Sequence, residues 1–86
     1  MDILVLRGQI DAIDRELTAL FTKRMVVSSA IGAYKKEQGL PIHVPQREQE
    51  IIDTVSQNSP KELAPYVARL YQEIFTLSRE YQEEII

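Results

Sequence analysis

An arginine interrupts the apolar seam of the longest helical pattern in this sequence. The apolar a and d positions of this heptad register are Ile3, Leu6, Ile10, Ile13, Leu17, Leu20, Val27, Ile31 and Tyr34. Arg24 stands where the register requires another apolar residue. A buried cation costs several kcal/mol unless an anion and hydrogen bonds compensate it. Arg24 therefore indicates either the selection of a coiled-coil register or oligomer state, or an anion at this point of the seam.

Other polar side chains also fall on stripes that should face the core. Each group has the spacing of one helix face within its own segment. The groups are Arg24, Ser28 and Lys35; Glu48, with Arg47 beside it; and Ser78 with Gln82. Taken separately, each has an ordinary explanation, such as a solvated ion pair, a cation at a helix end or a surface amide. Together they set three cations against one carboxylate. If the side chains converge, such a cluster suits an anionic guest.

Three helices of unequal length must position these side chains. A very long helix is expected from about residue 3 to about residue 37, with Gly39 at its left-handed end. A short helix is expected over about residues 46 to 56, with Pro45 placed to open it. A third, of medium length, follows, and no strand pattern competes. The fold class is therefore all-α, in a single domain over residues 1–86.

The start of the third helix has two candidates. Ser59 and Glu62 have the S-x-x-E spacing of a capping box, with Pro60 at the first helical position. Pro65 lies close enough downstream that the helix can instead begin there. Both starts remain open at the level of sequence.

The first helix is too long for a monomer of this size. At 1.5 Å per residue, about 35 residues span roughly 50 Å. A compact chain of this length is only about 30 Å across. The helix therefore extends beyond any body that one chain can build, and its seam needs a cover. An intertwined homodimer, in the form of a helical bundle, is the simplest solution.

Composition excludes several classes of function. The net charge of −3 gives no reason to expect nucleic-acid binding. Without cysteine and with one histidine, the chain offers no thiolate chemistry and no metal-ligand cluster, and no cofactor is expected. No apolar run approaches the roughly 20 residues that span a bilayer, and "MDILVLRGQI" lacks the basic region of a secretory signal. We expect a cytoplasmic protein that does not bind membranes.

The order of the polar positions resembles the all-helical chorismate mutase family. The resemblance rests on Arg7 within the opening "LRGQIDAIDREL", followed by "KRMVVSSAIGAYKK", "PIHVPQREQEII" and "LYQEIFTLSREYQ", and it covers nearly the whole chain. It implies an isomerase, an intramolecular transferase of the shikimate pathway. Such an enzyme converts chorismate to prephenate, for phenylalanine and tyrosine biosynthesis, by a pericyclic Claisen rearrangement in an intertwined dimer.

The resemblance implies a catalytic role for Arg24, Lys35 and Gln82. Arg24 would bind a carboxylate of chorismate. Lys35 would contact a carboxylate and the ether oxygen, and Gln82 would donate to that oxygen from the opposite side. Arg7 would reach in from the other subunit. Arg7 and Arg24 are 17 positions apart, about 25 Å along a helix, so both cannot reach one small ligand from a single straight helix.

The remaining positions would bind the substrate. By the same resemblance, Glu48 accepts a hydrogen bond from the ring hydroxyl, Arg47 supports that end and Ser78 contacts the ring carboxylate. The sequence departs from the family pattern at Val44, where many members carry an aspartate that helps to hold the hydroxyl end. Glu48 and backbone groups are left to supply that contact.

Two other functions stay open. An isochorismate–pyruvate lyase shares this fold and much of the cationic site, and the lyases also lack an acid at the position of Val44. A non-catalytic helical dimerisation module would use Arg24 for register alone. The long first helix, the short loop and the pair of Ser78 and Gln82 resemble the mutases more closely, which favours the mutase.

Overall fold

Three helices make up the part of the chain that the computed structural model describes, residues 2–85. They are α1, Ile3–Gln38, α2, Pro45–Gln57, and α3, Ala64–Ile85, and no strand occurs among the described residues. The prediction of an all-α fold with one very long, one short and one medium helix is confirmed. None of these helices combines the length and the apolar character that crossing a membrane requires.

The limits of α1 are set by residues at its two ends. At the start, Asp2 Oδ1 accepts a hydrogen bond from the backbone N–H of Leu4 at 3.1 Å. At the end, Gly39 adopts a left-handed backbone with φ of 67°, which only glycine enters without cost. Lys35 and Lys36 occupy the last turn, where cations complement the helix dipole. The predicted end lay one residue from the observed one.

The capping box predicted at the start of α3 is wrong. The Ser59 hydroxyl donates instead to the carbonyl oxygen of Val55 in the last turn of α2, at 2.6 Å. The chain then makes a turn, and α3 begins at Ala64. Pro65 therefore lies in the first turn, where its missing N–H has no helical partner to lose. Of the two candidate starts, the later one is correct.

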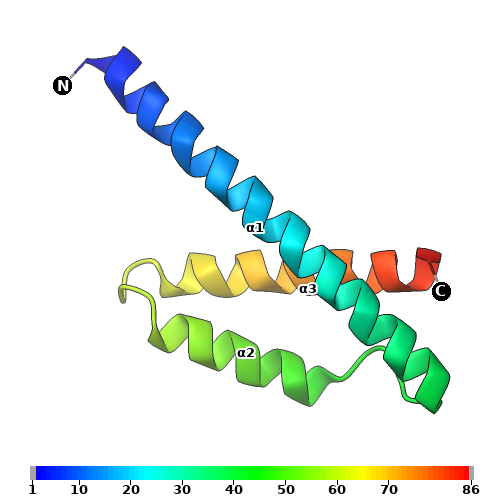
Figure 1. The fold of residues 1–86 in the computed structure, drawn as a ribbon. Helices are drawn as coiled ribbons and strands as arrows, with labels where there is room; N and C mark the ends of the chain where they lie inside the picture. The colour runs from blue at the N-terminus through cyan, green and yellow to red at the C-terminus, as the bar shows by residue number, and fades with distance from the viewer. Residues whose placement is uncertain (1, 86) are drawn as a thin grey trace.

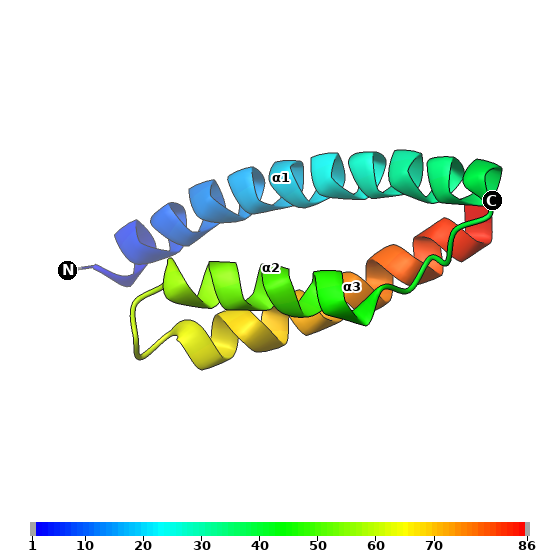
Figure 2. The same ribbon diagram turned by 90° about the horizontal axis from the view of Figure 1, so that it is seen from below.

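The helix α3 is the centre of the arrangement, because it packs against both α1 and α2 (Figure 1). Figure 2 shows α1 as one layer and α2 with α3 as a second. The N-terminal half of α1 projects beyond the other two helices (Figure 1). The chain extends 54 Å along its longest axis and has a radius of gyration of 15.9 Å. A compact chain of this length would have a radius of about 12 Å.

A single chain buries very little apolar surface. Of the large apolar side chains in the described residues, Phe75 alone is buried, whereas Ser28, Ser78 and Gln82 are buried polar residues. The seam residues of α1 from Ile3 to Leu20 are 39% to 62% exposed. A continuous apolar face of this length is typical of an interaction surface. Most of the buried side chains in the described part of one chain are thus polar.

Candidate active site

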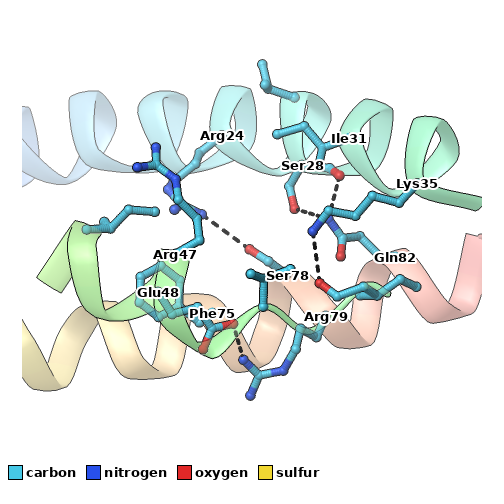
Figure 3. A pocket seen from close by; sticks show the side chains of 14 residues that line it. Arg24, Ser28, Ile31, Lys35, Arg47, Glu48, Phe75, Ser78, Arg79 and Gln82 are labelled. Carbon is cyan, nitrogen blue, oxygen red and sulfur yellow. Dashed lines mark hydrogen bonds and ion pairs between the residues drawn. The ribbon is translucent and has the colours of Figure 1, made fainter. Parts of the chain in front are cut away.

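A cavity of about 300 Å³ lies between α1, α2, α3 and the loop that joins α1 to α2 (Figure 3). Its volume is that of a site for a small molecule. The structure brings six of the seven predicted site residues to its walls. They are Arg24, Lys35, Arg47, Glu48, Ser78 and Gln82. Side chains from three helices, up to 58 residues apart in the sequence, therefore meet at one cavity, a convergence that the spacing within each helix left open.

The side chains of this cavity carry an excess of positive charge. Arg24, Lys35, Arg47 and Arg79 supply four cations, and Glu48 supplies the one carboxylate among the lining residues. Three positive charges are therefore in excess here, although the chain as a whole has a net charge of −3. A concave site lined by one sign of charge concentrates ligands of the opposite sign. The cavity is suited to a small molecule with more than one negative charge.

Arg24 is held in place by aromatic and hydroxyl groups of α3. Its guanidinium carbon lies 5.7 Å from the ring centroid of Tyr71 and 5.6 Å from that of Phe75, within the range of a cation–π contact. Its Nη1 donates to Ser78 Oγ at 3.3 Å. None of the ion pairs found within residues 2–85 involves Arg24. Its charge is thus available to an anionic ligand.

Lys35 enters the cavity from the last turn of α1. Its Nζ donates to the carbonyl oxygen of Ile42 at 3.0 Å, which ties the loop before α2 to α1 (Figure 3). An ammonium group has three donors. Two of them remain for a ligand.

Gln82 lines the cavity from α3 and is fixed by α1. Its Nε2 donates to the carbonyl oxygen of Ser28 at 2.7 Å and to the Ser28 hydroxyl at 3.0 Å. A Cβ added at Gly32 would lie 2.8 Å from Gln82 Cγ, so a glycine is needed for Gln82 to approach α1 this closely. Sequence reasoning missed Gly32. The available signal was a glycine inside a helix, where alanine is favoured by about 1 kcal/mol.

Glu48 reaches the cavity from the first turn of α2 and is contacted from two sides. Its Oε2 accepts a hydrogen bond from Arg79 Nη1, in an ion pair that joins α2 to α3 (Figure 3). The Nε2 of His43 lies 3.5 Å from Oε1. Sequence reasoning did not identify Arg79, because it directly follows Ser78 and is not on the inward stripe that contains Ser78 and Gln82.

Arg47 and two apolar side chains also line the cavity. Arg47 is exposed, and its Nη1 lies 3.6 Å from Glu50 Oε2 on the same helix. The side chains of Ile42 and Val44 line the same region and are apolar. Neither of them adds an acid, so Glu48 remains the one acid among the lining residues.

Arg7 does not line the cavity of its own chain. It is exposed on the N-terminal half of α1, about 25 Å along the helix from Arg24. One unbroken helix cannot fold Arg7 back to that site. The prediction that Arg7 serves the site of a second subunit remains a prediction.

Comparison with known proteins identifies the family. A family model described as chorismate mutase type II matches residues 6–83. The solved chorismate mutase (form II) of Thermus thermophilus is 30% identical, with a TM-score of 0.92 and 96% of each chain covered.

Three curated relatives agree with this match. The T-protein of Haemophilus influenzae is 51% identical over 50% of this chain and 11% of its own length. The bifunctional chorismate mutase/prephenate dehydratase of Aquifex aeolicus is 44% identical over 58% of this chain and 14% of its own length. The chain thus spans only a small part of these two proteins. The intracellular chorismate mutase of Mycobacterium tuberculosis is 38% identical over 80% of this chain and 68% of its own. The chain belongs to the chorismate mutase type II family.

Proposed function

We propose that this chain catalyses the rearrangement of chorismate to prephenate, a step of aromatic amino acid biosynthesis. The observation that carries the proposal is the cavity itself, where four cations, one carboxylate and a buried amide converge. Chorismate carries two carboxylates, an ether oxygen and a ring hydroxyl, so each class of lining group has a counterpart. The relative named intracellular chorismate mutase supports a cytoplasmic location.

The reaction needs neither a nucleophile nor a metal. It is unimolecular: the ether C–O bond breaks while a C–C bond forms between the side chain and the ring. The cavity holds the side chain over the ring in a reactive, chair-like conformer, which supplies rate by orientation. Arg24 binds a carboxylate with its unpaired guanidinium edge, and Ser78 contacts the ring carboxylate.

Lys35 and Gln82 stabilise the negative charge that develops on the ether oxygen. Lys35 retains its bond to Ile42 and offers another N–H to this oxygen. Gln82 keeps its shorter bond, to the carbonyl of Ser28, and exchanges the bond to the Ser28 hydroxyl for the ether oxygen. Both donors are preorganised by protein contacts, so little rearrangement accompanies the reaction.

Glu48 accepts the hydrogen bond of the ring hydroxyl, and Arg47 supports that end of the substrate. Val44 places an apolar side chain where an acid could have made a second contact with the hydroxyl. This feature keeps the isochorismate–pyruvate lyase as a second candidate. The mutase is favoured because the solved relative that matches 96% of this chain is named a chorismate mutase.

A direct assay separates these functions. The purified chain is incubated with chorismate, and the loss of chorismate absorbance and the formation of prephenate are followed. A parallel reaction contains isochorismate and is monitored for pyruvate and salicylate. Prephenate from chorismate supports the proposal, and pyruvate with salicylate identifies the lyase. Absence of both products leaves the non-catalytic dimerisation module and overturns the proposal.

We propose further that the active form is an intertwined homodimer with Arg7 contributed across subunits. The exposed seam of α1 supports this assembly, since nothing within residues 2–85 of one chain covers it. An apolar groove of α1 and α3 continues the seam and is lined by Leu17, Leu20, Phe21, Leu70 and Leu77, among others. A second copy of α1 has the matching apolar stripe. Residues 1–86 then act as one catalytic unit.

Mixing two inactive variants tests the role of Arg7. Arg7→Ala and Lys35→Ala are each expected to be inactive alone. In a mixed dimer, the chain with Arg7→Ala keeps Lys35 and receives Arg7 from its partner, so one intact site returns. Random exchange of subunits makes about half of the dimers mixed. Because each mixed dimer has one intact site of two, about a quarter of wild-type activity is expected to return. A mixture no more active than its components would place Arg7 outside the partner's site.

Replacement of Gly32 by alanine is expected to lower kcat about 10- to 100-fold with the fold retained. The added methyl group would meet Gln82 Cγ at 2.8 Å and push its amide out of position, and a misplaced donor costs rate. Steady-state kinetics and thermal unfolding measure the two effects. Gly8→Ala is the matched control, because a Cβ there has nothing within 4 Å. Unchanged kcat in Gly32→Ala would contradict the positioning of Gln82 by this contact.

A further inference from the structure

Arg79 is a lining residue to which no role has been given so far. Its guanidinium donates to Glu48 Oε2 across 31 positions of sequence, and the two side chains are 26% and 23% exposed. Neighbouring residues of an α-helix point about 100° apart. Ser78 faces α1, where it accepts from Arg24, so the next residue of α3 faces α2. The pair thus joins α3 to α2 at the wall of the cavity (Figure 3).

Glu48 needs such a partner because it stands among cations. A carboxylate free to rotate in this cavity would pair with Arg24, Lys35 or Arg47, since opposite charges attract strongly in a partly buried site. Each such pairing would remove a cation that the two carboxylates of the substrate require. It would also turn the carboxylate away from the ring hydroxyl. Arg79 engages one oxygen of Glu48 and prevents both losses.

We propose that Arg79 is a positioning residue, which holds Glu48 against the wall so that Oε1 faces the substrate hydroxyl. This inference rests on the proposed mutase function. His43 also faces Oε1, at 3.5 Å, a longer contact that a ligand hydroxyl can share because a carboxylate oxygen accepts more than one hydrogen bond. Arginine suits the task, since its planar fork of donors fixes a carboxylate in direction as well as distance.

The test is a double-mutant cycle of Arg79→Ala and Glu48→Gln, with kcat and KM measured for chorismate. Arg79→Ala alone is expected to lower kcat/KM roughly 10- to 100-fold, the effect of one charge-assisted hydrogen bond. Most of the loss falls on KM, because the hydroxyl contact exists in the ground state and the transition state alike. In the Glu48→Gln background, the same substitution is expected to change kcat/KM less than about threefold.

Two further variants complete the design. Arg79→Lys keeps the charge and is expected to recover part of the lost kcat/KM. Arg69→Ala removes an exposed arginine of the same helix and is expected to leave both constants unchanged. The cycle is repeated by calorimetry with a dianionic bicyclic transition-state mimic, so that binding is compared even in a variant without measurable turnover.

The outcomes separate this inference from the function on which it rests. A wild-type chain that neither converts chorismate nor binds the mimic overturns the proposed function. With an active wild type, an equal effect of Arg79→Ala in both backgrounds means that Arg79 acts on the substrate or on the fold, and it overturns the inference. An unchanged kcat/KM in Arg79→Ala also overturns it. A loss that disappears when Glu48 is replaced supports it.

Discussion

Replacement of Lys35 by alanine is expected to lower kcat at least 10²- to 10³-fold. Negative charge develops on the ether oxygen as the C–O bond breaks, and a preorganised donor at such an atom contributes about 3–4 kcal/mol to the transition state. Among the described residues, no other ammonium group lines the cavity to replace it. The change is measured as the initial rate of chorismate loss at saturating substrate.

The comparison must separate chemistry from folding. Lys35 also binds the Ile42 carbonyl, so thermal unfolding of the variant is followed by circular dichroism. Lys36→Ala is the matched control, because Lys36 belongs to the same last turn of α1 and does not line the cavity. A Lys35→Ala variant within tenfold of the wild-type kcat would defeat the assignment of Lys35 as the main donor.

Replacement of Arg24 by leucine is expected to abolish turnover without lowering stability. The substrate carboxylate loses its charged partner, which costs on the order of 10²- to 10³-fold in kcat/KM. The protein, in contrast, loses a half-buried cation and gains an apolar side chain on an apolar seam, an exchange that is often neutral or stabilising. Steady-state kinetics and the midpoint of thermal unfolding measure the two effects together.

The same variant distinguishes an enzyme from a dimerisation module. In a module, Arg24→Leu would change the midpoint of unfolding and the oligomeric state alone. In the proposed enzyme, the leucine variant keeps its midpoint or exceeds that of the wild type while kcat/KM collapses. A leucine variant with wild-type turnover would show that Arg24 does not bind the substrate.

The sequence was sufficient to predict α1 and α2 but not the start of α3. The limits of α1 follow from strong local signals, an unbroken apolar register and Gly39 at its end. Before α3, two local signals compete within a few residues. The Ser59 hydroxyl donates to the carbonyl oxygen of Val55. This hydrogen bond depends on where the preceding helix ends, and a capping pattern in the sequence does not contain that information.

The lining of the cavity was predictable where its residues lie on a regular stripe. Arg24, Lys35, Glu48, Ser78 and Gln82 share faces that periodicity alone identifies, and all of them line the cavity. Arg79 and Gly32 were missed for a common reason. Their importance depends on how closely one helix approaches another, and the spacing within a single helix carries no information on that approach.

If the outward-facing seam of α1 is covered by a second chain, as proposed, activity depends on protein concentration. In the proposed homodimer, each site lacks Arg7 until two chains meet, so dilution below the dissociation constant removes competent sites as well as dimers. A ligand that binds only the completed site draws the chains together by mass action. Specific activity should therefore fall on dilution and return when substrate or its mimic is added in excess.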